Sequence, residues 1–338
     1  MGRLQMALLG AGLMGRFHAE TLATMTQARL AAVIDVDGES ARKVAAEAGC
    51  PVAGSDPGAA LDDPGIDAVV IATPAFTHAD LIERAAAAGK AIFCEKPLAV
   101  DLAEARGVVE KVEASGVPFQ IGFQRRFDAG VERLRRAVAA GELGSLETFR
   151  SATADPSGTS FEAMQRAAGI FHDTLSHDMD MALLFFGPIS EVRAWGDACL
   201  DPRFLELGKP DTTSIGLRFE SGRLGTIENR LRTGYGYEAL LEVGGSLGKG
   251  VVRDDHADQL TLFGESGIVR AHVNWFLERY HDAYRSELRA FARAVLASSR
   301  PEPDVRQGFE VQLACLAAER SYREDRTVRL EELRSAAG

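Results

Sequence analysis

The sequence predicts an α/β protein of two domains. Residues 1–123 are expected to form a doubly wound parallel sheet, and residues 124–338 an α+β domain with a large open, mostly antiparallel sheet. The 338-residue chain is long for a single hydrophobic core. Strand-like and helical segments alternate in its first part, whereas strand-like segments follow one another directly after about residue 145. The C-terminal helix is expected to pack back on the first domain.

A glycine-rich turn follows the first predicted strand. Leu4 to Leu9 is apolar, and Gly10-Ala11-Gly12-Leu13-Met14-Gly15 joins it to a helical segment. A GxGxxG pattern in this position is typical of dinucleotide binding, because Gly10 permits the tight turn, Gly12 lets the backbone approach a pyrophosphate and Gly15 allows close helix–strand packing. The helix N-terminus, at Leu13 and Met14, offers N–H groups and a positive dipole end to the phosphates. Glycine-rich turns have other uses, so the pattern needs support.

The second predicted strand supplies that support, because it ends in a carboxylate. Leu30 to Ile34 is apolar, and Asp35 follows it, 20 residues after Gly15. In a Rossmann fold an acidic side chain here accepts hydrogen bonds from the adenine ribose hydroxyls. Asp35 would repel a 2′-phosphate, so the sequence favours NAD over NADP. Arg42 and Lys43 are more simply assigned to the solvated face of the next helix.

Strands and helices continue to alternate after Asp35. An all-apolar strand, such as Ala68–Ala72, is typical of a parallel sheet covered on both faces. The turn behind it makes Thr73 and Pro74 candidates for cofactor binding. His78, in the same turn, either contacts the cofactor or serves the start of the next helix, and the sequence favours neither. The remaining elements expected in this domain are a helix ending at Gly89, a strand over Ala91–Cys94, a helix over Asp101–Ser115 and a strand over Val117–Phe123.

Lys96 directly follows the strand Ala91–Cys94 and Glu95, and Pro97 comes after it. In an open parallel sheet, ligands bind outside this end of the strands, and the rigid ring of Pro97 restricts the backbone. An ammonium here can lie beside a substrate oxygen, and both Glu95 and Lys96 are cofactor candidates. Lys-Pro pairs are common in surface loops, so the prediction also depends on polar residues much later in the chain.

Those residues lie on a predicted helix, Phe171–Phe186, within a domain that otherwise consists of strands. The helix has an apolar stripe for the core, and Asp173, His177 and Asp180 form a separate polar stripe at i, i+4 and i+7. A carboxylate one turn from a histidine orients the ring and raises its basicity, so His177 is a candidate general base. The predicted strands of this domain are Ser145–Asp155, Ile189–Trp195, Thr212–Phe219, Arg223–Arg230, Tyr237–Val243 and Gln259–Phe263.

The polar stripe is also compatible with two arrangements that carry no catalysis by His177. An Asp-xxx-His spacing more often marks an exposed helix face with an i, i+4 ion pair. The catalytic interpretation is preferred here only because the chain also has the predicted nicotinamide-binding fold and Lys96. A metal site on His172 and His177 is unfavourable, because an i, i+5 spacing turns two side chains about 140° apart on a helix. No metal site is therefore expected.

The composition of the chain excludes several kinds of partner. A net charge of -11 would repel the phosphates of a nucleic acid. No apolar run approaches the roughly 18 residues of a membrane span. The four cysteines are widely spaced, without a CxxC pair, which fits a reducing cytoplasm better than a disulfide scaffold. We expect a cytoplasmic protein that binds a small molecule, with no nucleic-acid or membrane partner.

These features together resemble the Gfo/Idh/MocA oxidoreductases over nearly the whole chain. Within that family the sequence is most similar to the branch that oxidises inositol at carbon 2. The family resemblance is carried by Gly10–Gly15, Glu95-Lys96-Pro97, Gly122–Asp128 and Gly169–Asp178. The closer resemblance is carried by Asp155-Pro156, Ile227–Asn229, Tyr235–Tyr237 and Phe276–Tyr280, continuing to Phe291.

The resemblance implies an NAD-dependent enzyme that oxidises a secondary hydroxyl of a cyclic polyol, with myo-inositol converted to its 2-keto form as the first candidate. It implies Lys96, Asp173 and His177 as the catalytic group, and a homotetramer packed through the open sheet. The alternative substrates are a related isomer such as scyllo-inositol, an aldopyranose sugar, or an amino- or keto-inositol intermediate. A non-catalytic NAD-binding regulatory protein is the remote alternative. The implied substrate-binding residues are the catalytic three with Arg126, Asp155, Tyr235 and Tyr237.

Overall fold

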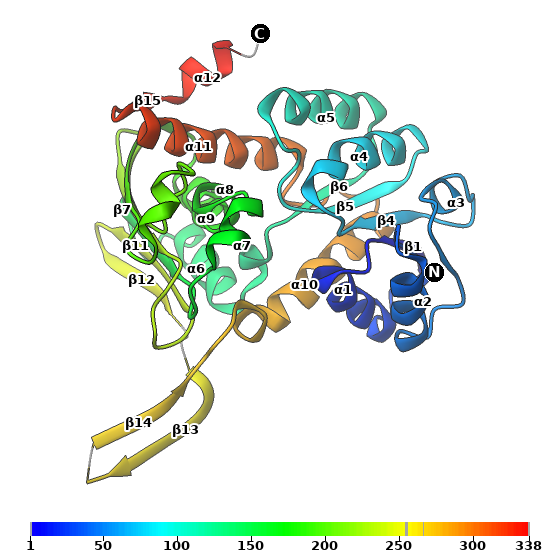
Figure 1. The fold of residues 1–338 in the computed structure, drawn as a ribbon, viewed down its shortest axis with the longest axis horizontal. Helices are drawn as coiled ribbons and strands as arrows, with labels where there is room; N and C mark the ends of the chain where they lie inside the picture. The colour runs from blue at the N-terminus through cyan, green and yellow to red at the C-terminus, as the bar shows by residue number, and fades with distance from the viewer. Residues whose placement is uncertain (1, 254–255, 266, 337–338) are drawn as a thin grey trace. The chain divides into compact units, whose positions relative to one another are not determined.

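The computed structural model describes residues 2–253, 256–265 and 267–336. The chain divides into two compact units, whose elements are labelled in Figure 1. The first unit extends to Gln124 and includes Tyr284–Glu310, and the second contains Arg125–Ala283 and the residues from Val311 onward. Positions 1, 254–255, 266 and 337–338, which belong to the two predicted domains, lie outside the described residues.

The first unit is built on the predicted parallel sheet, whose strand order is β3-β2-β1-β4-β5-β6. This is a doubly wound order, which reverses beside β1. β4 is buried at every position, as its apolar sequence predicts. The strands are β1 (Leu4–Leu9), β2 (Ala28–Ile34), β3 (Ala53–Gly54), β4 (Ala68–Ile71), β5 (Ala91–Glu95) and β6 (Phe119–Gly122). The helices between them are α1 (Leu13–Thr24), α2 (Gly38–Glu47), α3 (Gly58–Leu61), α4 (His78–Ala87) and α5 (Leu102–Ser115).

A later helix completes the core of the first unit. α10 (Phe276–Leu296) begins in the second unit, and its residues from Tyr284 onward belong to the first. Leu288 and Phe291 lie in the same hydrophobic cluster as β1 and α1. The ring of Phe291 packs edge-on against Phe93 of β5, with 5.9 Å between ring centroids. The apolar side chains of this helix therefore serve packing.

The second unit contains the predicted open sheet, with strand order β12-β11-β7-β10-β9-β8-β15. Most neighbours are antiparallel, but β7 and β10 pair in parallel, so the sheet is mixed. The strands are β7 (Leu146–Ala154), β8 (Ile189–Asp197), β9 (Thr212–Phe219), β10 (Leu224–Arg230), β11 (Glu238–Gly245), β12 (Gly248–Arg253) and β15 (Val328–Arg329). The helices are α6 (Ala129–Ala139), α7 (Phe161–Arg166), α8 (Ile170–Asp173), α9 (Leu175–Phe186), α11 (Val305–Glu324), which begins in the first unit, and α12 (Leu330–Ala336).

One face of this sheet is buried and the other is open. Along β9 and β10, buried and accessible side chains alternate residue by residue, the pattern of an antiparallel sheet covered on one side. A separate two-stranded ribbon, β13 (His256–Gly264) and β14 (Gly267–His272), extends from the unit (Figure 1). Within the described residues, no helix combines the length and apolar character needed to cross a bilayer.

The predicted single helix over Phe171–Phe186 is wrong in its continuity. The structure has two helices, α8 and α9, which meet at Thr174. Here the N–H of His177 donates to the carbonyl oxygen of Thr174 at 3.4 Å, and the Ser176 hydroxyl donates to the carbonyl oxygen of Asp173 at 3.3 Å. A side-chain donor near a helix terminus competes with the backbone for its carbonyl groups. Asp173 therefore ends one helix and His177 lies in the first turn of the next.

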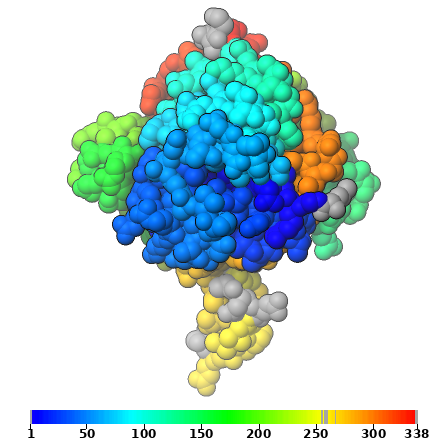
Figure 2. Space-filling view, turned by 90° about the vertical axis from the view of Figure 1, so that its right-hand side faces the viewer, coloured from blue at the N-terminus to red at the C-terminus, as the bar shows by residue number. Residues whose placement is uncertain are grey.

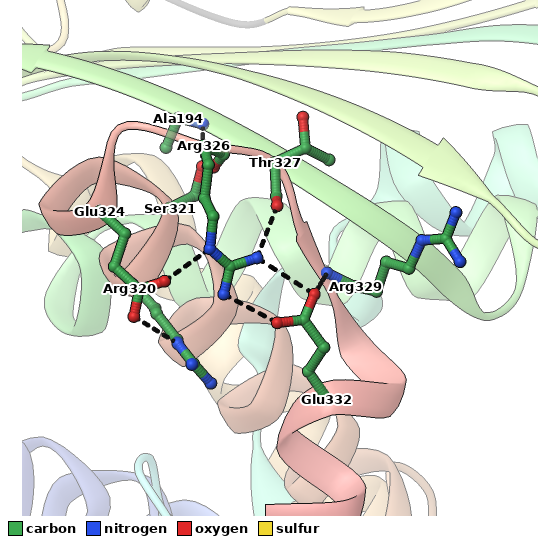
Figure 3. Close-up of polar contacts among 8 residues, drawn as sticks. All are labelled: Ala194, Arg320, Ser321, Glu324, Arg326, Thr327, Arg329 and Glu332. Atoms are coloured by element: carbon green, nitrogen blue, oxygen red, sulfur yellow. Dashed lines mark hydrogen bonds and ion pairs between the residues drawn. The ribbon is translucent and has the colours of Figure 1, made fainter.

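The C-terminal segment is fixed to the edge of the open sheet by a network around Arg326 (Figure 3). The Arg326 guanidinium donates to Glu324 at 2.7 Å, to Glu332 at 2.7 Å and to the carbonyl oxygen of Thr327 at 2.9 Å. The Ser321 hydroxyl donates to the Arg326 carbonyl oxygen and accepts from the N–H of Ala194 in β8. The network thus joins α11, β15 and α12 to β8.

Replacing Glu332 by glutamine should lower the unfolding temperature at neutral pH. The hydrogen bond from Arg326, together with the N–H of Arg329, lowers the pKa of Glu332 from the ordinary 4.5 to about 2. A carboxyl with a lowered folded-state pKa stabilises the fold fully above its unfolded value, and this stabilisation is lost as pH falls through the folded value. The difference between variant and unaltered chain should therefore shrink from pH 4.5 toward pH 2.

Thermal unfolding followed by circular dichroism across this pH range measures the effect. Glu331→Gln is the matched control, because Glu331 is mostly exposed and lies 3.5 Å from Arg329. An equal loss in the two variants, or a difference that does not depend on pH, would contradict the assignment.

Candidate active site

The turn between β1 and α1 fits the pyrophosphate of a dinucleotide. Gly10 has a φ of 103°, and a Cβ there would collide with the carbonyl oxygen of Ala72, while a Cβ at Gly15 would collide with that of Gly10. A Cβ at Gly12, by contrast, would meet nothing within 4 Å. Gly12 also gives α1 no side-chain cap, so no side chain of the N-cap residue competes for the first N–H groups. The open backbone and the helix start together form an anion cradle.

Asp35 stands beside this cradle at the end of β2. Its Oδ2 accepts from the N–H of Ala11 at 2.6 Å, and its Oδ1 accepts from the N–H of Asp37 at 2.8 Å. These bonds hold the carboxylate against the turn itself. A carboxylate in this position attracts ribose hydroxyls and repels a phosphate group.

Glu95 and Lys96 come to the same edge of the sheet at the end of β5. Because β5 runs parallel to β4 and β6, its carboxyl end lies on the side where Thr73 and Pro74 follow β4. Lys96 is half-buried, and the peptide bond between Lys96 and Pro97 is cis. The structure thus brings together the candidates that the sequence places after separate strands.

Two predicted cofactor ligands turn their polar atoms toward the protein. The ring of His78 is buried, with Nδ1 2.6 Å from the Pro97 carbonyl oxygen and Nε2 2.9 Å from that of Thr73. The carboxylate of Glu95 is also buried, with Oε1 2.7 Å from Nε2 of His18. The interactions of these two side chains are therefore with neighbouring segments of the first unit.

In the second unit, Asp173 is exposed and His177 is half-buried on successive helices. The expected polar stripe does not include Asp180, whose side chain is buried. Arg126 binds the Asp180 carboxylate through Nε at 2.9 and 3.0 Å and through Nη2 at 2.6 Å. Burial raises the pKa of Asp180, and the charge of Arg126 works in the opposite direction. A buried carboxylate needs such a partner, so these donors of Arg126 are committed to Asp180.

Asp178 is the centre of a second buried network, on the side of α9 that faces the sheet. Its Oδ1 accepts from Arg125 at 3.0 Å, from Thr153 at 3.0 Å and from Ser151, and its Oδ2 accepts from Asn229 at 2.8 Å. Asp178 has no exposed surface. These bonds attach the first turn of α9 to β7 and β10. They therefore set the position of His177, the preceding residue.

The network continues to one predicted substrate ligand. Arg125 Nη2 lies 3.2 Å from the hydroxyl of Tyr237, and its guanidinium packs 5.4 Å from the ring centre of Tyr280. Burial raises the pKa of Tyr237, and Arg125 opposes that shift. The hydroxyl of Tyr237 is therefore protonated at neutral pH, with its oxygen held by Arg125.

The other two predicted substrate ligands are more accessible. Asp155 is half-buried directly after β7, where its N–H donates to the Arg230 carbonyl oxygen at 3.0 Å. Tyr235 is about half exposed, and its hydroxyl donates to Glu238 at 2.5 Å. Tyr235 and Tyr237 are two residues apart, yet only Tyr237 belongs to the buried network.

Several residues that organise the site were missed by the sequence interpretation. His18 has no distinctive spacing, and Arg125 and Asp178 lie in segments that carry the family resemblance without a role assigned to them by the sequence. The adjacent pair Arg125-Arg126 carries a signal in retrospect, because two carboxylates, Asp178 and Asp180, are its partners. Within the described part of the chain, no group of three or more histidine, cysteine, aspartate or glutamate side chains could hold a metal ion.

Replacing Asp178 by alanine should destabilise the protein by about 3–5 kcal/mol, because it leaves the buried Arg125 without its carboxylate. Urea unfolding measures this loss. Met181→Leu, at another buried position of α9, is the control and should cost less than about 1.5 kcal/mol. Similar losses in the two variants would show that Asp178 has no special role in anchoring α9.

Comparison with known proteins agrees with this architecture. A family model described as the oxidoreductase family with an NAD-binding Rossmann fold matches residues 4–123, and the model of the GFO/IDH/MocA C-terminal domain matches residues 131–251. Together these matches cover more than half of the chain.

Individual relatives match along nearly the full length. The myo-inositol 2-dehydrogenase of Thermotoga maritima is 34% identical over 98% of this chain and 99% of its own. The scyllo-inositol 2-dehydrogenase (NAD(+)) of Bacillus subtilis is 35% identical over 99% of both. The crystal structure of scyllo-inositol dehydrogenase from Lactobacillus casei, with bound NAD(H) and scyllo-inositol, is 26% identical, has a TM-score of 0.93 and covers 98% of this chain and 100% of its own. The chain belongs to the GFO/IDH/MocA family of NAD-binding oxidoreductases.

Proposed function

We propose that this protein is an NAD-dependent dehydrogenase that oxidises a secondary hydroxyl of a cyclic polyol, with myo-inositol converted to 2-keto-myo-inositol (scyllo-inosose). The observation that carries the proposal is the full-length similarity to a myo-inositol 2-dehydrogenase. The chain also has the residues that this oxidation needs, a lysine at the cofactor edge and a histidine with a neighbouring carboxylate. The comparable similarity to a scyllo-inositol 2-dehydrogenase makes scyllo-inositol the second candidate substrate.

In the proposed reaction His177 is the general base. It removes the proton of the substrate hydroxyl, and Asp173 orients the imidazole ring. Lys96 stabilises the negative charge that develops on the same oxygen. When bound, NAD supplies the hydride acceptor for the carbinol carbon. Both proton and hydride are thus accounted for, and the carbinol becomes a ketone.

We assign the remaining substrate hydroxyls to Asp155, Tyr235 and Tyr237. The support is their accessibility or chemistry within the second unit: Asp155 is half-buried, Tyr235 is about half exposed, and the hydroxyl of Tyr237 is held by Arg125. The sequence predicts Arg126 as a substrate-binding residue, but we propose that it has a positioning role. Because it is bound to Asp180, it fixes α9 and thereby His177.

The proposed preference for NAD over NADP rests on Asp35. Its carboxylate is held by the N–H groups of Ala11 and Asp37, so it cannot swing away from an approaching 2′-phosphate without breaking two hydrogen bonds. Val36, the next residue, is 93% exposed and brings no positive charge.

We also propose a homotetramer that packs through the open sheet. Trp195 and Leu224 on the sheet are more than half exposed, and a groove of about 310 Å³ beside Trp195 is lined by Ser214, Glu228 and Arg230. The ribbon, yellow in Figure 2, exposes more than half of each of five large apolar side chains, Leu260, Leu262, Phe263, Ile268 and Val269. Apolar surface of this extent is typical of protein contacts. Sedimentation velocity would contradict the proposal by giving the mass of a single chain.

A substrate panel tests the proposed function. Myo-inositol, scyllo-inositol, glucose, galactose and xylose are each offered with NAD or NADP, and the absorbance of the reduced cofactor is followed. The highest kcat/KM is expected for myo-inositol with NAD. Tight NAD binding without turnover of any polyol would support a non-catalytic role, and a higher kcat/KM for NADP would contradict the role of Asp35.

Replacing His177 by alanine should lower kcat by about 10²–10⁴, the usual contribution of a positioned base. The Kd for NAD should stay within a few-fold, because His177 belongs to the second unit and the cradle to the first. His172→Gln is the matched control, since its ring is bound to Glu319 at 3.0 Å and has no proposed role in the reaction. Turnover of His177→Ala equal to that of the control would exclude the assignment.

A further inference from the structure

Two buried histidines hold the segment that contains Lys96, one on each side. His18 contacts Glu95, the residue before Lys96, and His78 contacts Pro97, the residue after it. Both histidines belong to the first unit, and each comes from an element of the cofactor cradle. His18 lies on α1, and His78 begins α4 behind the Thr73 turn.

The contact of His18 is a buried hydrogen bond to the carboxyl group of Glu95. Its Nε2 is 2.7 Å from Oε1 of Glu95, and the histidine has no exposed surface. Its other ring nitrogen, Nδ1, makes no hydrogen bond within the described residues, so the ring has one polar partner. The ring packs edge-on against Phe93, at 5.4 Å between centroids. This aromatic contact restricts the ring and therefore the carboxylate that it binds.

The Glu95 side chain also lies close to the backbone of Gly122 in β6. A Cβ on Gly122 of β6 would lie 2.9 Å from Oε2 of Glu95, which is closer than side chains pack. The absence of a side chain at Gly122 is therefore what makes room for this carboxylate. Glu95 is thus enclosed between α1 and β6.

The contact of His78 joins two loops through their backbones. Nδ1 lies 2.6 Å from the carbonyl oxygen of Pro97, and Nε2 lies 2.9 Å from that of Thr73. A carbonyl oxygen only accepts and a neutral imidazole carries one N–H, so the ring can donate to either carbonyl oxygen, one at a time. The ring is 1% exposed, and both of its polar atoms are used by the protein. His78 therefore links the Lys96 loop to the Thr73 loop.

We propose that His18 and His78 are positioning residues that fix the backbone of Lys96 relative to the cofactor cradle. His18 sets the residue before Lys96 from the helix at the pyrophosphate turn, and His78 sets the residue after it from the Thr73 loop. The inference rests on the proposed function only for the chemical role of Lys96. The mechanical part, that the segment is held by these two rings, is independent of any reaction.

The mechanical part is tested by hydrogen exchange of the peptide that contains Glu95, Lys96 and Leu98. His18→Leu and His78→Leu should each speed exchange in this peptide, because each removes one of its attachments. Ile82→Val is the control, since Ile82 is fully buried on the same helix as His78, and its shortening costs about 0.5–1.5 kcal/mol of stability without removing a hydrogen bond. Exchange in the histidine variants that is no faster than in the control would overturn the proposal.

The chemical part is tested by a double-mutant cycle with Lys96→Met. Each histidine variant should lower kcat by about 10–100-fold in the unaltered chain, since small misplacement of a reacting group has effects of that order. In the Lys96→Met background the same change should alter kcat by no more than about twofold, because independent effects multiply and coupled ones do not. Equal fold-losses in the two backgrounds would mean that the histidines act only on stability.

Replacement with different side chains separates the hydrogen bond from simple packing. His78→Gln keeps an amide donor, and His78→Leu keeps only bulk, so the glutamine variant should retain the higher kcat. Equal kcat values would contradict a tie made by hydrogen bonding. If the unaltered protein oxidises no polyol, the proposed function has failed, and the exchange measurement still decides whether the histidines hold the segment.

Discussion

The parallel register of the six-stranded sheet is the constraint on which the candidate site depends. Because β1, β2, β4 and β5 run in one direction, their carboxyl ends meet at one edge. The glycine turn, Asp35, the Thr73 loop and Lys96 each follow one of these strands. Residues 86 positions apart in the chain, such as Gly10 and Lys96, are thereby placed at the same edge of the sheet. The buried, apolar strands are what make this edge stiff enough to hold a geometry.

In the second unit, the main constraint is the burial of charged side chains on α9. Asp178 and Asp180 lie on the inner side of α9 with no access to water, where an unpaired carboxylate would cost several kcal/mol. Two consecutive arginines, Arg125 and Arg126, provide their partners. The helix is therefore fixed to its surroundings through directional bonds as well as through apolar packing. Such bonds specify one orientation of α9, which a purely apolar face would leave less defined.

The elements that the sequence predicts well are those whose signal is local. The apolar run Ala68–Ile71 and the glycine turn after β1 depend on neighbouring residues, and the structure has them as expected. The helix predicted over Asp101–Ser115 is present as α5, and Asp101 caps it by accepting from the N–H of Glu104 at 2.9 Å. The catalytic roles of Lys96, Asp173 and His177 stay predictions, supported by chemistry and family membership.

The elements that the sequence interpretation missed depend on partners far away in the chain. The parallel pairing of β7 with β10 joins residues 76 positions apart, and no local pattern distinguishes it from an antiparallel pair. The spacing of Asp180 from His177 suits one helix face, and it therefore predicts a polar stripe that the structure does not have. The partner of Asp180, Arg126, is 54 residues earlier, so the burial of that carboxylate is apparent only from the fold.

The tie made by His78 has a consequence for how the chain tolerates change. Its partners are main-chain carbonyl groups, which every amino acid possesses. Substitutions at positions 73 and 97 that preserve the backbone path would leave both acceptors in place. Loss of the imidazole at position 78 would therefore break this junction, whereas substitutions at positions 73 and 97 would leave its hydrogen-bond acceptors in place.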